Sequence, residues 1–588
     1  MGPEIPYKRK RIELWANHND VDKHQRRNES SADRLTYDVL ANIFTFLPLS
    51  ERLKMDQVCH RWQVANTCEW GKTKKIHLTK WINQIKRLLT STNVEAKLRH
   101  NSNFLTHLTI TDYLCDSSVV NYINNNCLNI IYLNFKLYLN KINKNYLRKG
   151  FDNLNKLKSI KIKAVINDSS LSNTIDYYHY FLQTINSEIN ELYLQSNSYK
   201  KTMILLSEDF AWIIDGFSKL SHLTLRHFEL DENAMVGICQ SINLIHLDLH
   251  GCHIHDQMPI LNLTNLEHLT LSWIANIDEN LIDELPRLNK LQYLDINCSS
   301  LGNGMYDSIS YIKTLVHLDV NHCLNIDDEF ITNIIDNCKQ LKHLDIACCA
   351  LISSEVLERL GELNNLEYLN LDKVNNVNKN VIVSLTDDAT KLKHLDISYA
   401  ENLTHHDIEI IGKLRDLESL RMNRVNSVNN ILIASIVFNC LKLKHLDLSN
   451  STNLSERAYS DIAKLKNLER LVIVHSLDAQ NAIPTEMPQL KYFNCSKSHK
   501  VYDEHVEKFL INCPNLEELV ICQNPITLKI FNIAAKLTNQ RKNNIPLTIY
   551  TSANFLPFIK ETNLQLNLLK LSTEHAFKEH PFSYELED

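Results

Sequence analysis

The chain has 588 residues, of which 44% are hydrophobic and 22% charged, and its formal net charge is -6. This composition is typical of a globular protein, and so weak a charge argues against nucleic acid or a membrane surface as a partner. The longest apolar run, 431–438, is far shorter than the roughly 20 residues that cross a bilayer. We therefore expect an intracellular protein, in the cytoplasm, the nucleus or both.

The first 33 residues are polar and basic, and we expect a disordered arm because they hold little apolar material to bury. The arm contains the cluster KRKR at 8–11. This cluster is either a nuclear localisation signal or one of the short basic runs that are common in disordered tails. At the other end, 573–588 is an acidic tail, which we interpret as a solvated end.

Residues 34–71 predict a compact all-α module with short helices over 37–47, 50–55 and 57–66. Pro48 separates the first two helices, because proline cannot continue a helix that precedes it. A module of about forty residues has too small a core to be stable alone. We therefore expect it to be supported by a partner, by the rest of the chain, or by both.

From 72 to 572 the sequence repeats the apolar pattern Leu-x-x-Leu-x-Leu about seventeen times, with a spacing of about 25 residues. One clear copy is Leu341, Leu344 and Ile346. Such a period is typical of a solenoid, in which each unit has an apolar face that only its neighbours can cover. Solenoids present long surfaces for binding, so the repeat favours recognition over catalysis.

Each repeat predicts one strand and one helix. Leu318 and Val320 alternate with polar residues, which indicates a short strand with its apolar side inward. Ile326, Phe330 and Ile334 then follow at helical spacing. The sequence therefore predicts an α/β horseshoe, with parallel strands on the inner curve and helices outside.

The array is less regular near its ends. The stretch 176–181 (DYYHYF) lengthens one repeat, and it is either an inserted loop that carries specificity or a helix with aromatic packing. The sequence leaves these two readings open. Near the C-terminus, Leu547-x-Ile549 and the pattern ending at Leu569 and Leu571 predict final strands that cap the last exposed apolar face.

The chain contains 15 cysteines, and several follow the repeat period. Cys127, Cys338, Cys440 and Cys513 each precede the first apolar position of a repeat by three residues. No Cys-x-x-Cys pair occurs, and a reducing compartment keeps thiols free. We therefore predict small apolar residues packed in the core, and neither disulfides nor a bound metal or cofactor.

The segment 35–47 (LTYDVLANIFTFL), followed by Leu53 and by 58–62 (VCHRW), resembles an F-box. With the array behind it, the chain resembles the F-box/leucine-rich-repeat proteins, whose repeats are of the cysteine-containing type. Two positions depart from the family pattern. Thr36 stands where the family usually has proline, and His60 stands where it usually has arginine or lysine.

The resemblance implies a non-enzymatic substrate receptor of an SCF (Skp1-cullin-F-box) ubiquitin ligase. In that family the F-box docks on the adaptor Skp1, and the repeats hold the protein to be ubiquitinated and degraded. The alternative is a scaffold or inhibitor that binds a partner along the horseshoe outside any ligase. Some matching positions must pack the module's own core, and the sequence does not separate these. The positions matching adaptor contacts are Leu35, Leu40, Ile43, Phe44, Leu47, Leu53, Val58, Cys59 and Trp62.

Several strands carry a histidine and an aspartate on either side of an inward leucine. Alternation along a strand places both on the concave surface, where stacked repeats align them as columns. These columns form an acidic groove for a basic target segment, tuned by histidine protonation, or a metal site, or they reflect the default aspartate of the repeat. The clearest pairs are His343 and Asp345, His394 and Asp396, and His445 and Asp447.

Catalytic motifs are not found in the sequence. It has no His-Glu-x-x-His, no Gly-x-Ser-x-Gly and only 10 glycines, so we predict no catalytic residues. Two short polar clusters follow strands, where such residues commonly cap helices. We interpret both as solvated turn residues. They are His253, His255 and Asp256, and His405, His406 and Asp407.

Overall fold

The computed structural model describes most of the chain, in separate segments. They are 35–47, 52, 55, 58–70, 74–77, 98–99, 102–115, 117–138, 150–165, 180–196, 203–299, 306–476, 487–543, 545–555 and 568–572. The predicted arm at 1–33, the tail at 573–588 and Leu53 lie outside these segments, as do residues 176–179 of the lengthened repeat.

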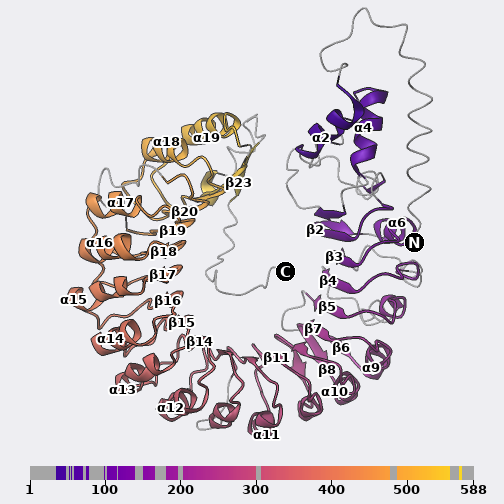
Figure 1. Cartoon of the computed structure of the whole chain (residues 1–588), viewed down its shortest axis with the longest axis horizontal. Helices are drawn as coiled ribbons and strands as arrows, with labels where there is room; N and C mark the ends of the chain where they lie inside the picture. Colours follow the sequence, from indigo (N-terminus) through magenta and orange to yellow (C-terminus); the bar gives the residue numbers. More distant parts are fainter. Residues whose placement is uncertain are drawn as a thin grey trace, which may run out of the picture.

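The array is a curved, open ring with strands on its inner edge and helices on its outer edge (Figure 1). Within the described residues the main sheet has 20 strands, and every pair that shares a register is parallel. The strands are β1 (Lys75–His77), β2 (His107–Cys115), β3 (Tyr132–Tyr138), β4 (Ser159–Val165), β5 (Glu191–Ser196), β7 (His222–Arg226), β9 (His246–Asp248), β11 (His268–Thr270), β12 (Tyr293–Asp295), β13 (His317–Asp319), β14 (His343–Asp345), β15 (Tyr368–Asn370), β16 (His394–Asp396), β17 (Ser419–Arg421), β18 (His445–Asp447), β19 (Arg470–Val472), β20 (Tyr492–Asn494), β21 (Glu518–Val520), β22 (Leu547–Tyr550) and β23 (Leu569–Ser572).

The outer edge carries an α-helix in some repeats, a short 3-10 helix in others, and in some an α-helix that continues directly into a 3-10 helix. The α-helices of the array are α6 (Ser117–Asn126), α9 (Glu208–Asp215), α10 (Glu232–Cys239), α11 (Glu279–Glu284), α12 (Asp328–Asn337), α13 (Ser354–Leu357), α14 (Lys379–Asp387), α15 (His405–Ile408), α16 (Asn430–Asn439), α17 (Glu456–Ile462), α18 (Asp503–Asn512) and α19 (Lys529–Asn539). The 3-10 helices are η4 (Met258–Asn262), η5 (Leu285–Arg287), η6 (Asp307–Tyr311), η7 (Glu358–Glu362), η8 (Glu409–Lys413) and η9 (Ala553–Phe555). None of the helices in the described segments combines the length and the apolar character that crossing a bilayer requires.

The repeated leucines hold the array together. Leu341, Leu344 and Ile346 are completely buried, and Leu344 lies in register with Leu318 of the strand before it. Burying one such side chain contributes about 1.5–3 kcal/mol, and here each is covered by the repeats on either side. The chain therefore folds as the predicted leucine-rich-repeat solenoid, in which stability comes from stacking.

The cysteines belong to this core. Cys323 and Cys349 are completely buried, and each thiol donates a hydrogen bond to a main-chain carbonyl of the previous repeat, on Ile296 and Val320 at 3.3 and 3.4 Å. Burial raises the pKa of Cys323 to about 12, so this thiol stays protonated. Among the described cysteines nine are buried, as predicted for core residues, whereas Cys59 is exposed and Cys298, Cys348 and Cys522 are half-buried.

From β7 to β21, the turn after each strand of the main sheet contains one residue in the left-handed conformation. His322 (φ 57°) and Lys373 (φ 59°) are examples, and in one repeat the position is taken by Gly251 (φ 64°). The amide of this residue donates to a carbonyl one repeat further on, as from His322 to Ala347 at 2.9 Å. The turns are therefore tied to one another outside the sheet, a feature that the sequence pattern did not predict.

A second, three-stranded parallel sheet forms beside the main one in the repeats around α9 and α10 (Figure 1). Its strands are β6 (Ile204–Leu206), β8 (Phe228–Leu230) and β10 (His253–Ile254). In the lengthened repeat just before it, the Phe181 ring is buried and packs edge-on against Phe151, with ring centroids 5.8 Å apart. The last residue of the aromatic stretch 176–181 is thus part of the core.

Candidate functional site

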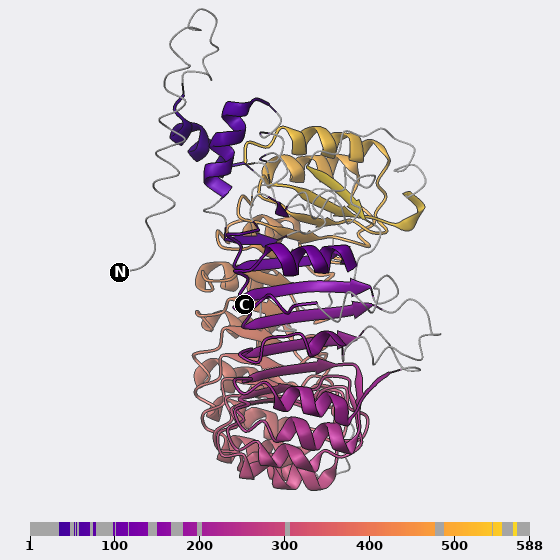
Figure 2. The same cartoon turned by 90° about the vertical axis from the view of Figure 1, so that its right-hand side faces the viewer.

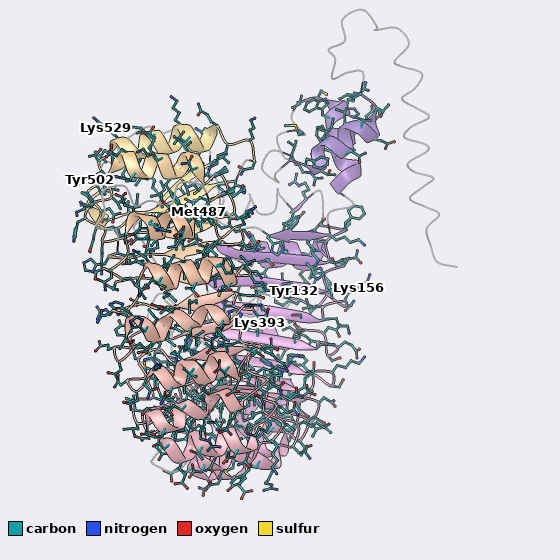
Figure 3. All side chains as sticks on the ribbon, turned by 60° about the vertical axis from the view of Figure 1, so that its left-hand side comes forward. Tyr132, Lys156, Lys393, Met487, Tyr502 and Lys529 are labelled. Carbon is teal, nitrogen blue, oxygen red and sulfur yellow. The ribbon has the colours of Figure 1, made fainter. Side chains whose placement is uncertain are left out.

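Two surfaces are candidates for binding, and the first is the N-terminal helical pair. Helices α2 (Tyr37–Thr45) and α4 (His60–Trp70) extend beyond the N-terminal strands of the array (Figure 2). Drawn with side chains, they form a body of their own (Figure 3). The second predicted helix, at 50–55, falls mostly outside the described residues.

The helical pair has a core separate from that of the array. Leu40, Phe44 and Ala65 are buried together, and the Phe44 and Trp62 rings lie 5.2 Å apart. None of these residues belongs to the long apolar core of the repeats. A helical module of about forty residues gains little stability from its own packing.

Thr36 takes over the role that proline has at this position in the family pattern. Its backbone is extended, and its hydroxyl accepts a hydrogen bond from the amide of Val39 at 3.4 Å. It therefore acts as the N-cap of α2, and threonine is a favourable residue for this role. The helix α2 therefore begins at Tyr37, directly after Thr36.

Apolar side chains also lie on the outer face of α2, away from the small core. Val39, Ile43 and Phe46 have exposed fractions of 42%, 44% and 87%, and their spacing places them along one side of the helix. Val58, just before α4, is 56% exposed. A body this small that exposes four large apolar side chains has the character of an interaction surface.

The structure divides the described residues among the predicted adaptor contacts into three groups by exposure. Leu40 and Phe44 are buried, so they hold the helices in place and cannot themselves form the surface. Ile43, Val58 and Cys59 are exposed. Leu35, Leu47 and Trp62 are partly buried against the small core. The match to the F-box pattern missed two exposed side chains, those of Val39 and Phe46. Their i, i+4, i+7 spacing through Ile43 would have indicated them.

The second surface is the concave face of the array, which carries a continuous aromatic column. At its centre the Tyr293, His317, His343 and Tyr368 rings stack with centroids 3.7–3.9 Å apart. The strands pair in register at these positions, which is why the rings meet. We call the column the ring ladder: His222, His246, His268, Tyr293, His317, His343, Tyr368 and His394.

Five histidines of the ring ladder have lowered pKa values and are uncharged near neutral pH: His246, His268, His317, His343 and His394. Burial is the main cause in each case, and it lowers the pKa of His246 to about 4 and that of His317 to about 3. The pKa of His343 is also well below its ordinary value, and that of His394 is lowered. These lowered pKa values argue against the predicted tuning of a groove by histidine protonation in the physiological range.

A column of aspartates, which we call the acidic column, runs beside the ring ladder, two residues further along the strands. Asp295, Asp319 and Asp345 are in register on adjacent strands. Burial, and the carboxylates beside them, raise the pKa of Asp295 and Asp345 well above its ordinary value, and burial raises that of Asp319 to about 6. Asn370 donates to Asp345 at 2.8 Å. This column is consequently less negative than its sequence indicates.

Arg421 neutralises the far end of the column. It replaces the aspartate in β17, and its guanidinium lies 3.1 Å from the Asp396 carboxylate and 3.8 Å from that of Asp447. All three side chains are largely buried. A buried charge is costly without a partner, and here one arginine serves two carboxylates.

These findings correct the expected accessibility of the concave pairs. His343, Asp345 and Asp396 lie on the inner strands as predicted, but their exposed fractions are only 9%, 6% and 2%. His394 and His445 are partly exposed. Burial lowers the pKa of His445 to about 4. The concave face is therefore a packed, nearly neutral surface along much of its length and not an open acidic groove.

The alternative of a metal site in these columns finds no support in the described segments. There, one set of three histidine, cysteine or carboxylate side chains has all its ligand atoms within 4.8 Å of one another, and that set lies outside the columns. It consists of Glu229, His253 and His255, of which the two histidines were interpreted above as solvated turn residues.

Comparison with known proteins gives distant relatives, and no family model matches the chain. Adenylate cyclase of Schizosaccharomyces pombe is 26% identical over 272 residues, which cover 42% of this chain and 16% of the cyclase. Disease resistance protein RPS4B of Arabidopsis thaliana is 24% identical over 248 residues, 39% of this chain and 20% of that protein. F-box/LRR-repeat protein 4 of Bos taurus is 24% identical over 293 residues, 47% of this chain and 44% of that protein. The matches thus span less than half of each of these relatives.

Three solved structures cover most of this chain at low similarity. A leucine-rich-repeat protein of Leptospira interrogans has a TM-score of 0.41 and 20% identity, over 77% of this chain and 97% of its own. The internalin InlF of Listeria monocytogenes gives 0.30 and 17%, over 74% and 96%. A chain of the Rad7 and Elc1 complex in yeast gives 0.38 and 13%, over 84% and 95%. At these scores the fold assignment depends on the repeats and strand pairing described above.

Proposed function

We propose that this leucine-rich-repeat scaffold is the substrate-recognition subunit of an SCF-type ubiquitin ligase. The observation that carries the proposal is the exposed apolar face of α2, formed by Val39, Ile43 and Phe46 on a body whose core is separate from the array. In this proposal Skp1 covers that face and joins the chain to a cullin. The 24% identical F-box/LRR-repeat protein of Bos taurus supports it by name.

The proposed division of labour follows from the separation of the two surfaces. The helical pair stands at one end of the ring, and the strands of the array line the inner edge of the ring (Figures 1 and 2). Tethering a target beside a charged conjugating enzyme raises its effective concentration and makes transfer nearly intramolecular. The chain contributes position, and the catalytic groups belong to other subunits. Such a subunit would act in the cytoplasm, the nucleus or both.

The concave face is the proposed place for the target protein. Its neutral ring ladder and shielded carboxylates favour a target that buries aromatic and polar area, since rings at an interface supply large contact area with few rotamers to fix. A strongly basic segment is a poorer match, because Arg226 and Arg421 already pair with Asp248 and Asp396.

Co-purification from cells tests the ligase assignment. The double variant Ile43→Asp with Phe46→Ser removes exposed apolar area without touching the small core, so it should fold and yet fail to recover Skp1 and the cullin. Phe438→Ser is the matched control, because Phe438 is 81% exposed on α16 and far from α2. Leu40→Ala or Phe44→Ala would not distinguish loss of the adaptor surface from unfolding of the helical pair, since either substitution also leaves a cavity in the small core.

Target recognition needs a second experiment. Proximity labelling with the proteasome blocked, compared between the intact chain and a version lacking 34–71, should find the same bound proteins in both, but with ubiquitin on them only for the intact chain. If neither form is associated with ubiquitinated proteins and Skp1 is absent, the chain is a scaffold or inhibitor acting outside a ligase.

A further inference from the structure

The small second sheet brings three metal-ligating side chains to one surface. In it, β10 pairs with β8 in parallel, with His253 opposite Glu229 and Ile254 opposite Leu230. The amide of His255 extends the pairing by donating to the Leu230 carbonyl at 3.0 Å. Both histidines are thus positioned by main-chain hydrogen bonds.

Strand alternation explains why all three side chains share a face. Ile254 and Leu230 are 7% and 0% exposed and point into the core. The residues on either side of Ile254 therefore point outward, and so does Glu229. The side chains of His253, His255 and Glu229 remain 61%, 40% and 34% exposed. Their face lies outside the ring ladder and the acidic column.

The distances suit a tetrahedral ion. Glu229 Oε1 lies 3.0 Å from His255 Nε2 and 3.9 Å from His253 Nδ1. Two ligands held about 2.0–2.1 Å from zinc at a tetrahedral angle lie about 3.3–3.4 Å apart. The two separations from Glu229 bracket this value, and the ligand atoms of all three residues lie within 4.8 Å of one another, so rotamer changes would complete the geometry.

We propose that Glu229, His253 and His255 form a binding site for a single Zn²⁺ ion. Two neutral imidazoles and one carboxylate are a donor set that zinc uses in proteins, with a fourth position left for water or for a side chain of a bound partner. The exposure of the three side chains leaves this fourth position open to solvent. The proposal does not depend on the ligase assignment.

A metal titration of the full-length, reduced protein tests the site. Competition with a chromophoric chelator should show one tight Zn²⁺ equivalent. His255→Ala and Glu229→Gln should each weaken it by at least about 100-fold, because even the loss of a group behind a ligand commonly costs about 10- to 100-fold. Co²⁺ in place of zinc should give ligand-field bands without the near-ultraviolet charge transfer of a cobalt–thiolate bond.

The matched control is His406→Ala. His406 is also exposed, at 91%, and lies 3.7 Å from Glu409, yet it belongs to no set of three converging ligands in the described segments. This variant should bind zinc as the unaltered chain does, and all variants should have the same melting temperature without metal. Undiminished binding by His255→Ala, a thiolate spectrum with Co²⁺, or no saturable equivalent would overturn the proposal and leave only a histidine–glutamate hydrogen bond.

Discussion

The rings of His317 and His343 stack on adjacent strands with centroids 3.7 Å apart and planes 17° from parallel. In-register pairing of β13 and β14 produces the contact. Close stacking removes water from both imidazoles, and this desolvation is the main reason why both pKa values are low. The same contact therefore sets both the packing and the charge of the concave face.

The first prediction concerns the pH dependence of stability. The pKa of His317 is about 3 in the folded chain and about 6.5 when unfolded. Between these values the unfolded state binds the proton, so His317 destabilises the fold as pH decreases below about 6.5. His317→Tyr keeps a stacking ring of a kind the ladder already uses and removes this titration. Acidification from pH 7 to 5 should then cost about 1–2 kcal/mol less of unfolding free energy.

Urea unfolding at the two pH values measures this difference. The elevated pKa of Asp319 acts in the opposite direction, because protonation in the folded state stabilises it below pH about 6. That contribution is present in both proteins and cancels in the comparison. His406→Tyr, at an exposed site outside the ring ladder, is the control variant for the same substitution. An equal loss of stability in His317→Tyr and the unaltered chain would contradict the desolvation account.

The second prediction concerns the left-handed turns. A Cβ at Gly251 would lie 2.6 Å from Nδ1 of His227, and the backbone there has φ 64°. Gly251→Ala should therefore destabilise the array by at least about 1–2 kcal/mol, from the left-handed conformation and the clash together. His322→Ala, at the same turn position with φ 57°, should change stability by less than about 0.5 kcal/mol.

A double-mutant cycle separates the two causes. His227→Ala combined with Gly251→Ala removes the clash but keeps the left-handed backbone. Thermal melts should therefore show a favourable coupling of about 0.5–3 kcal/mol between the two sites. Strict additivity would mean that the close approach of His227 has no energetic consequence.

The third prediction concerns the buried arginine. Arg421→Met leaves the Asp396 and Asp447 carboxylates without their cation and should cost about 3–5 kcal/mol. Lys442→Met breaks the exposed ion pair with Asp416, 2.7 Å long, and should cost less than about 1 kcal/mol. Chemical denaturation at neutral pH compares the two. A similar small cost for both variants would show that water reaches the Arg421 cluster.

The sequence was sufficient to predict the solenoid, because the leucine period is imposed by stacking itself. Leu341, Leu344 and Ile346 are buried as predicted, and Cys323 and Cys349 occupy core positions with their thiols bonded to the previous repeat. Because every repeat must show the same apolar pattern, a single sequence contains many copies of it, and the pattern can be recognised without related sequences.

Other features depend on side-chain environment and could not be predicted. The left-handed turn position is held by residues as different as Trp273 and Lys373, so no residue type marks it. Strand β10 has two residues, too few to show a period. Burial lowers the pKa of His343 well below its ordinary value, whereas the sequence indicated that His343 and Asp345 form a titratable pair.

Binding of purified Skp1 to the full-length chain tests the central claim most directly. The account predicts a saturable complex that Ile43→Asp weakens by at least about 2 kcal/mol, or about 30-fold, as expected for loss of a central apolar contact. Phe438→Asp, at an even more exposed apolar side chain on α16, should bind like the unaltered chain. No measurable complex, or equal affinity for Ile43→Asp and Phe438→Asp, would contradict the account.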